Sequence, residues 1–496
     1  MAELLLGQSY YLRFDPKPWE AMQPYPPLGT LYAASYLREQ GFEVALFDAM
    51  LASSTSEWQD SLQRHRPDFA VLYEDSFNYL SKMCLLRMRE AAFEMIGQAR
   101  CSGATVIVSS SDATDHLEEY FARGADYILI GEAEQTLAAL LASLTGRSTR
   151  PANAIAGVAQ PGARTGTVPA AGPERDLDRL PFPAWDLVDL DRYREAWLRR
   201  HGFFSLNMVT TRGCPYSCNW CAKPIYGQRY NSRSPENVVL ELACLKRLAD
   251  PDHIWFADDI FGLKKGWIER FSQLVCQQDL QTPFKCLLRA DLVTRRRAAQ
   301  LRRAGCQTVW IGAESGSQKI LDAMDKGTTL EDNLRATRQL QQAGIEVGHF
   351  LQFGFPGEGW REIRETVRML RRSRPDDIGI SVSYPLPGTK LFQRVQAHMG
   401  DQRNWRDGND LAMLYRGSFS TRFYRRLHRV LHTEQRARLG WKQLLGGDWK
   451  GLKPMLRALR LPWDWMRLQG MRLSQRSVRK PGQGSGQRSW GLRTAD

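Results

Sequence analysis

Short apolar runs alternate with longer amphipathic stretches along most of this chain, and this alternation limits the possible folds more than any other feature. Between residues 1 and 145, runs such as Asp68–Tyr73 and Thr105–Ser109 have the length of strands, and segments such as Leu28–Gln40 have helical periodicity. Strands that alternate with helices form parallel sheets covered by helices. The sequence therefore predicts a doubly wound, Rossmann-like α/β domain, whose ligand, if it has one, would lie at the carboxyl ends of the strands.

The same alternation resumes near residue 201 with a longer period. Residues 146–200, rich at first in Ala, Gly, Pro and Thr, are predicted to form a linker, with a small irregular hairpin in the first half as the alternative. Six strand-like runs follow: Phe204–Thr210, His253–Asp258, Phe284–Arg289, Thr308–Ala313, Val347–Phe353 and Ile378–Ser383. Six βα units predict a partial (β/α)6 barrel over residues 201–400, with its chemistry at the carboxyl ends of the strands.

Length and composition agree with a folded protein of several domains. The 496 residues exceed the size of one ordinary core. No apolar run approaches the roughly 20 residues of a membrane span, and the N-terminal segment lacks the basic region of a secretory signal. Six cysteines are scattered through apolar or helical surroundings and are predicted to be free thiols: Cys84, Cys101, Cys244, Cys276, Cys286 and Cys306. We therefore expect a cytoplasmic location.

The net charge of +14 comes from the C-terminal region alone. Residues 401–496 contain 21 Lys and Arg against 7 Asp and Glu, so residues 1–400 are neutral. Residues 401–475 are predicted to form a helical basic domain, because leucines recur at helical spacing with Arg457 and Arg460 between them. Such helices can lie on an anionic membrane or bind nucleic acid, or simply pack on the barrel with a basic face exposed. The packed helical domain is favoured, with peripheral membrane contact as the alternative and nucleic acid disfavoured. A disordered tail is expected over residues 476–496.

Three cysteines with the spacing CxxxCxxC directly follow the first predicted barrel strand. They are Cys214, Cys218 and Cys221, and an aromatic residue, Trp220, precedes the last one. Three thiolates on one loop suit a four-iron cluster, and with no fourth cysteine nearby one iron would stay open to a small molecule. The alternatives are three unrelated core cysteines or a zinc knuckle completed by His201 or His253. Trp220 and the preceding strand favour the cluster.

This loop resembles the signature CxxxCxΦC of the radical S-adenosylmethionine (SAM) enzymes, in which Φ is aromatic. The resemblance implies that the three cysteines hold a 4Fe-4S cluster whose open iron binds the amino and carboxylate groups of SAM. It also implies reductive cleavage of SAM to a 5'-deoxyadenosyl radical, with electrons from an external reductant such as flavodoxin or ferredoxin. Trp220 would contribute to cofactor binding.

Residues at the other strand ends extend the resemblance. Asp258 and Asp259 stand where the family places acceptors for the SAM ammonium group, Glu314 and Ser315 where it contacts the ribose and methionine, and Gly354 beside the adenine. Arg289, near Asp291, ends the third strand, so it is expected at the same carboxyl end of the barrel. Each turn could equally serve to cap the next helix.

The N-terminal segment resembles the cobalamin-binding domain of one large group of radical SAM enzymes. The resemblance rests on Pro24–Gly29, on Asp48 after the second strand and on Ala125–Glu134. It implies cobalamin contacts from Pro27, Gly29, Ser109, Ser110, Gly131 and Glu132. The DxHxxG motif, whose histidine binds cobalt from below, is absent from the sequence. His116 lacks its spacing and is better explained as a solvated helix-cap residue, so we expect no histidine beneath the cobalt.

Together these resemblances imply a cobalamin-dependent radical SAM methyltransferase that acts on an unactivated carbon of a small or lipid-like substrate. An anaerobic oxidative cyclase or rearrangement enzyme of the same architecture is the first alternative. A non-catalytic cobalamin or iron-sulfur sensor is another. A radical methylthiotransferase is disfavoured, because the N-terminal domain lacks that family's three auxiliary cysteines. The sequence assigns no catalytic acid or base.

Overall fold

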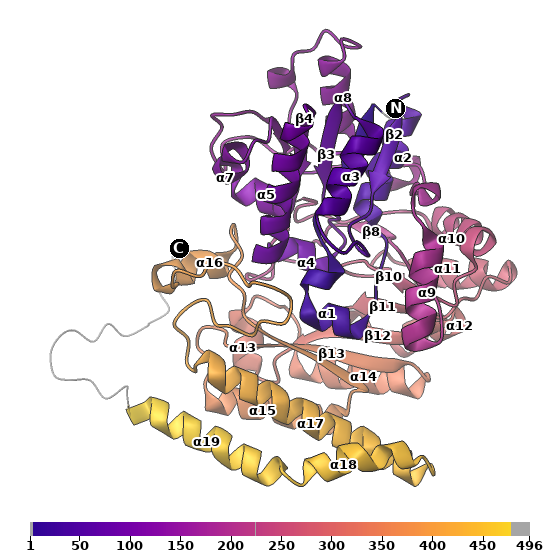
Figure 1. Cartoon of the computed structure of the whole chain (residues 1–496). Coiled ribbons are helices and arrows are strands. Elements are labelled where there is room, and N and C mark those ends of the chain that lie inside the picture. Colours follow the sequence, from indigo (N-terminus) through magenta and orange to yellow (C-terminus); the bar gives the residue numbers. More distant parts are fainter. Residues whose placement is uncertain (1–2, 224, 478–496) are drawn as a thin grey trace, which may run out of the picture. The chain divides into compact units, whose positions relative to one another are not determined.

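The computed structural model describes residues 3–223 and 225–477, with side chains to residue 472 (Figure 1). The chain divides into two compact units, residues 1–416 and residues 417–496. The tail predicted to be disordered, 476–496, lies outside the described residues except for its first two, which end the last helix.

The first sheet of the larger unit has six strands in the order β2-β1-β3-β4-β5-β6. Their bounds are β1 (Leu4–Gly7), β2 (Val44–Phe47), β3 (Phe69–Tyr73), β4 (Thr105–Ser109), β5 (Tyr127–Leu129) and β6 (Val158–Ala159). The first five are parallel, as predicted. The prediction missed β6, which lies within residues 146–200, predicted to be a linker, and pairs antiparallel with β5.

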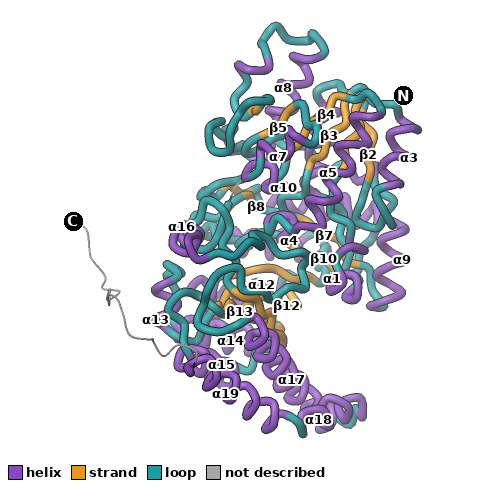
Figure 2. The backbone as a smooth tube through the Cα atoms, turned by 60° about the vertical axis from the view of Figure 1, so that its left-hand side comes forward, coloured by secondary structure: helices purple, strands orange, loops and turns teal. Residues whose placement is uncertain are grey.

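Helices cover both faces of this sheet (Figures 1 and 2). One core contains residues of α2 (Leu28–Glu39) and α8 (Glu134–Leu144), and the other contains residues of α3 (Ser56–His65), α5 (Leu86–Cys101) and α7 (Leu117–Ala122). The short helices are α1 (Pro16–Ala21), α4 (Tyr79–Lys82) and α6 (Ser111–Asp115). The sequence pattern of residues 79–101 predicts a single helix, and this is wrong, because Cys84 takes a left-handed backbone (φ +53°) that separates α4 from α5.

The second sheet has six parallel strands in the order β14-β13-β12-β11-β10-β7, which is their order along the chain reversed. They are β7 (Ser205–Met208), β10 (His253–Phe256), β11 (Phe284–Leu288), β12 (Cys306–Glu314), β13 (Glu346–Phe353) and β14 (Asp377–Val382), so all six predicted strands are confirmed.

The helices of this half follow the strands in turn. They are α10 (Pro235–Ala249), α11 (Trp267–Gln277), α12 (Arg295–Arg303), α13 (Gln318–Ala323), α14 (Leu330–Gln342), α15 (Trp360–Ser373) and α16 (Lys390–Val395). A further helix, α9 (Leu190–His201), precedes β7 and occupies the end of the predicted linker.

The smaller unit is a helical hairpin of α17 (Thr421–Leu445) against α18 (Leu452–Ala458) and α19 (Leu461–Ser477). Two glycines allow its two arms to touch, since a Cβ on Gly451 would lie only 2.1 Å from the carbonyl oxygen of Gly440. Among the described residues, no helix is both long enough and apolar enough to cross a membrane.

Candidate active site

The three cysteines lie on a hairpin loop that follows β7. Its stem is the antiparallel pair β8 (Thr211–Arg212) and β9 (Asn231–Ser232). The loop enters through Gly213, which has a φ of +79° and approaches the opposite arm so closely that a Cβ would lie 2.5 Å from the Arg229 carbonyl oxygen. Glycine alone tolerates both conditions, and it sets the start of the loop at Cys214.

The loop is anchored between its cysteines. The backbone N–H of Asn219 donates to the Met324 carbonyl (3.0 Å) and its side-chain amide donates to the Ala323 carbonyl (2.8 Å), both at the end of α13. Trp220 packs against a core cluster that includes Ile320 and Phe355. The cysteine thiols therefore project from a loop whose intervening residues are fixed.

One observation fits an iron-sulfur cluster here, and a second predicts a consequence of its binding. The buried indole N–H of Trp220 has no hydrogen-bond partner among the described residues, although buried donors are nearly always paired. Burial and the Asp259 carboxylate raise the pKa of the Cys221 thiol to about 12, so iron loading would release protons. No three described Cys, His, Asp or Glu side chains converge as ligands of one ion. In a cubane each thiolate binds its own iron, so no such convergence is required.

The zinc alternative is wrong on geometry. His253 opens β10 and its Nδ1 lies 2.9 Å from the Ser205 hydroxyl at the start of β7. That is the amino end of the strands, whereas the cysteine loop follows the carboxyl end. His201 is hydrogen-bonded to the carbonyl oxygens of Ala21 and Met22. Neither histidine completes the cysteine set.

Asp258 and Asp259, predicted as equivalent acceptors, differ in their environment. Buried Asp258 accepts four hydrogen bonds of 2.7–3.0 Å from the backbone and hydroxyl groups of Thr210 and Thr211, so it holds the stem of the cysteine loop. Asp259 pairs with Lys82 of α4, at 3.0 Å, and both side chains are partly exposed. Only Asp259 thus presents its carboxylate at the loop.

The ends of β11 and β12 also reach the cysteine loop. The Arg289 guanidinium lies 3.6 Å from the ring centroid of Tyr216 and pairs with Asp291. Buried Glu314 has a left-handed backbone (φ +54°) and forms a 2.8 Å ion pair with Lys326, whose ammonium lies 6.0 Å from the ring of Trp220.

Ser315 is fully buried, and its side chain stabilises the turn in which it lies. Its hydroxyl accepts from the Ser317 N–H (3.1 Å) and lies 3.2 Å from the Thr366 hydroxyl of α15. Gly354, after β13, has a φ of +80°, and its carbonyl oxygen accepts from the Tyr415 hydroxyl (2.7 Å). The predicted residues after β10, β11, β12 and β13 therefore all lie at carboxyl strand ends.

Glu358 lies in the turn after β13 and provides a pH-dependent test of that turn. One oxygen accepts from the Gly354 N–H (2.6 Å), the other has no partner among the described residues, and burial raises its pKa to about 8. Between pH 4.5 and 8 the unfolded chain loses a proton that the folded chain keeps, so the free energy of unfolding falls as pH rises through this window. Glu358→Gln is expected to match wild type near pH 4.5 and to exceed it by a few kcal/mol at pH 8. Melting curves across this range check it, and parallel profiles for the two proteins would contradict it.

At the first sheet, Pro27 and Gly29 lie at the start of α2. The Gly29 N–H donates to Asp75 (3.0 Å), which follows β3, and a Cβ on Gly29 would come within 3.2 Å of that carboxylate. Burial raises the pKa of Asp75 to about 6. Pro27 precedes this contact, and the neighbouring Pro26 carbonyl accepts from the Asn207 side chain of β7 (3.0 Å), so this segment joins the two sheets.

The loop after β4 contains a buried ion pair instead of a histidine. Ser109 ends β4, and the Ser110 hydroxyl caps α6 by accepting from the Ala113 N–H (2.8 Å). Asp112 accepts two hydrogen bonds from Arg89, at 2.6 and 2.7 Å. His116 instead lies 3.0 Å from Glu119, as expected for a residue at a helix cap.

Two buried polar atoms fit a ligand at the same sheet edge. One carboxylate oxygen of Glu74 and the hydroxyl of Ser81 have no hydrogen-bond partner among the described residues, and both follow β3. Burial raises the pKa of Glu74 to about 7. Gly131, after β5, has a φ of +90°. A polar ligand at this edge would complete the unmade hydrogen bonds.

Glu132 is committed to a partner from the second half of the chain. Arg212, just before the cysteine loop, pairs with Glu132 and with Glu134 (2.8 Å), and all three side chains are buried. Together with the Lys82–Asp259 pair, this shows that the carboxyl ends of both sheets face one another across the cysteine loop.

Three cations in this region lie outside the sequence-based predictions: Lys82, Arg212 and Lys326. Each pairs with a predicted or neighbouring acid, and for Lys82 the partner is 177 residues away in sequence. A signal was available only for Arg212, which directly precedes the glycine of the cysteine motif.

Comparisons with known proteins agree with this geometry. Residues 208–370 match the model of the Radical SAM superfamily. An uncharacterized methyltransferase of Pyrococcus horikoshii is 26% identical over 77% of this chain and 81% of its own. The anaerobic magnesium-protoporphyrin IX monomethyl ester cyclase of Rubrivivax gelatinosus is 26% identical over 75% of this chain and 66% of its own. The solved structure of the radical SAM methyltransferase TsrM from Kitasatospora setae superposes with a TM-score of 0.64 and 19% identity, over 80% of this chain and 78% of that one.

The fold and the cysteine loop thus define a radical SAM enzyme. Because the superposition covers far more than residues 208–370, the N-terminal sheet is part of the shared fold. More particularly, the chain shares with TsrM a fold in which an α/β domain stands ahead of the radical SAM domain.

Proposed function

We propose that this chain is a cobalamin-dependent radical SAM methyltransferase. The observation that carries the proposal is the meeting of two sheets at their carboxyl ends, where one provides the cysteine loop and the other the edge with unmade hydrogen bonds. TsrM was solved with cobalamin and a 4Fe-4S cluster bound, and it shares this fold. Residues 1–145 would form the cobalamin-binding domain and residues 201–400 a partial (β/α)6 barrel.

The residues fall into two proposed groups. Cys214, Cys218 and Cys221 would hold the cluster, with Asp259 accepting from the SAM ammonium group. Trp220, Arg289, Glu314, Ser315 and Gly354 would shape the rest of the SAM site, and Pro27, Gly29, Ser109, Ser110 and Gly131 the cobalamin edge. When bound, the cluster and SAM would supply the radical and cobalamin the methyl group. Asp258 and Glu132 would act indirectly, because their carboxylates already hold Thr210, Thr211 and Arg212.

The substrate is proposed to be a small or lipid-like molecule that is methylated at an unactivated carbon. The cyclase relative favours one alternative, an oxidative cyclase or rearrangement enzyme, since it matches three quarters of this chain. Both activities would use the same architecture, so the fate of the methyl group has to distinguish them.

Anaerobic reconstitution with iron, sulfide and hydroxocobalamin tests the proposal. When the reconstituted protein is reduced in the presence of SAM, a methyltransferase is expected to retain cobalamin and to release both 5'-deoxyadenosine and S-adenosylhomocysteine. Formation of 5'-deoxyadenosine alone would favour the cyclase. Cleavage of SAM without retention of cobalamin would refute the role of residues 1–145, and absence of multiple turnovers would indicate a sensor.

A further inference from the structure

Five large apolar side chains form a line on the surface of the smaller unit. They are Leu452, Leu456, Leu459, Trp463 and Met466, on α18, α19 and the turn between them, with exposed fractions of 44–77%. Their spacing of four, three, four and three residues places them on one helical face. We call this line the apolar stripe. Contiguous apolar surface of this kind marks an interaction site.

The opposite face of the same helices makes the internal contacts of the unit. Leu468 is fully buried, Asp464 pairs with Arg426 of α17 at 2.8 Å, and Gly451 touches Gly440. The hairpin is therefore held together without the apolar stripe, which is left for another partner.

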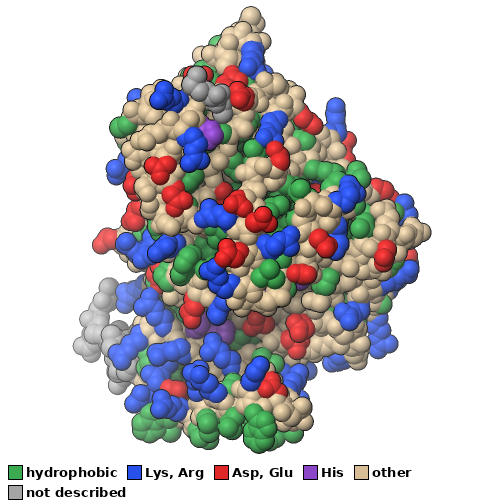
Figure 3. Space-filling view, turned by 45° about the vertical axis from the view of Figure 1, so that its right-hand side comes forward, with side chains coloured by type: hydrophobic (Ala, Val, Ile, Leu, Met, Phe, Trp, Pro, Cys, Tyr) green, Lys and Arg blue, Asp and Glu red, His purple; other side chains and the backbone are tan. Residues whose placement is uncertain are grey.

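Basic residues flank the apolar stripe along its length. Lys453, Arg457, Arg460 and Arg467 each directly follow a residue of the stripe, and residues 417–472 contain 13 Lys and Arg against three Asp and Glu. Figure 3 shows hydrophobic side chains gathered over α18 and α19 beside Lys and Arg side chains. Trp449, 78% exposed, lies three residues before the start of α18.

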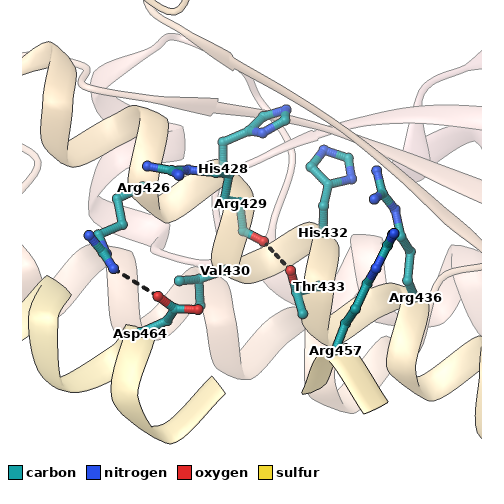
Figure 4. A pocket seen from close by; sticks show the side chains of 9 residues that line it. All are labelled: Arg426, His428, Arg429, Val430, His432, Thr433, Arg436, Arg457 and Asp464. Atoms are coloured by element: carbon teal, nitrogen blue, oxygen red, sulfur yellow. Dashed lines mark hydrogen bonds and ion pairs between the residues drawn. The ribbon is translucent and has the colours of Figure 1, made fainter. Parts of the chain in front are cut away.

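A cationic pocket lies within the same unit. Figure 4 shows Arg426, Arg429, Arg436 and Arg457 around it, with His428 and His432 from α17. The cavity measures about 300 Å³. Arg457 also lines a second cavity of about 740 Å³ together with Trp449 and with Leu452 and Leu456 of the apolar stripe. Guanidinium groups in such an arrangement suit a phosphate.

We infer that residues 417–472 dock on the surface of an anionic phospholipid bilayer. The apolar stripe enters the boundary between headgroups and acyl chains, and the flanking Lys and Arg contact lipid phosphates. Charge and apolar surface together favour a lipid bilayer over a second copy of this chain or a nucleic acid. A second copy would bring two strongly basic surfaces together, and a nucleic acid would leave the apolar stripe in water. The inference does not depend on the chemistry proposed above.

Co-sedimentation of the full chain with lipid vesicles tests the inference. The chain is expected to bind vesicles of phosphatidylcholine containing phosphatidylglycerol at least about tenfold more tightly than pure phosphatidylcholine. Leu456→Gln/Leu459→Gln/Trp463→Gln and Arg457→Gln/Arg460→Gln should each weaken binding by about tenfold or more. The matched control, Leu240→Gln/Leu248→Gln, alters exposed leucines of α10 and should bind like wild type.

Several results would overturn this docking. One is equal binding by the apolar variant and wild type, and another is release of the chain from vesicles by free glycerophosphate. Dimerisation that only the apolar variant abolishes, without vesicle binding, would identify a second copy as the occupant. Binding to duplex DNA that is lost only in the arginine variant would identify nucleic acid.

Discussion

Cys218→Ala is expected to lose the iron-sulfur cluster and, with it, SAM cleavage. With only three thiols on the loop, one substitution leaves two ligands for four irons. We expect iron content to fall to background and the rate of 5'-deoxyadenosine formation to fall at least about 100-fold. This loss exceeds the usual effect of mutating a residue that only hydrogen-bonds to a metal ligand. The loop itself should persist, because Asn219 holds α13 through its backbone and amide groups.

Cys101→Ala provides the matched control. Cys101 ends α5, is exposed and lies outside the cysteine loop. The variant should keep its iron, the visible absorbance of the iron-sulfur cluster and its SAM-cleavage activity. If Cys218→Ala retained iron and activity while Cys101→Ala lost them, the assignment of the cluster to this loop would be wrong.

The strands and the cysteine loop could be predicted from the sequence because both are local. A buried parallel strand is a short apolar run, and all six strands of the second sheet follow such runs. Two-residue β6 carries too little pattern to be recognised, and the left-handed backbone at Cys84 has no sequence signal in a non-glycine residue.

The roles of the acidic residues could not be predicted, because they depend on distant partners. Asp258 and Asp259 are adjacent in sequence, yet one is used by Thr210 and Thr211 and the other by Lys82. Glu132 was predicted from the resemblance to contact a cofactor, and the structure shows it bound to Arg212. In each case the partner is 47 to 177 residues away, so the pairing is visible only once both sheets have folded.

Arg212→Met is expected to destabilise the larger unit severely. The guanidinium is buried between Glu132 and Glu134 and lies over the rings of Tyr32 (5.5 Å) and Tyr226 (5.4 Å). Its removal leaves two buried carboxylates facing each other without a cation. Breaking such a network by removing one partner costs about 3–5 kcal/mol. The melting temperature should fall by roughly 3 to 6 °C, as measured by circular dichroism.

The cause can be separated from simple loss of packing. In the triple variant Arg212→Met/Glu132→Gln/Glu134→Gln no buried charge remains, so most of the lost stability should return. Arg38→Met removes an exposed ion pair with Asp186 and should cost no more than about 1 kcal/mol. If the triple variant were as unstable as Arg212→Met, the charges would not be the cause. Arg212 directly precedes Gly213, where the cysteine loop begins, and pairs with the edge of the first sheet. The single variant should therefore also slow SAM cleavage even where it remains folded, and the rate of 5'-deoxyadenosine formation measures this effect.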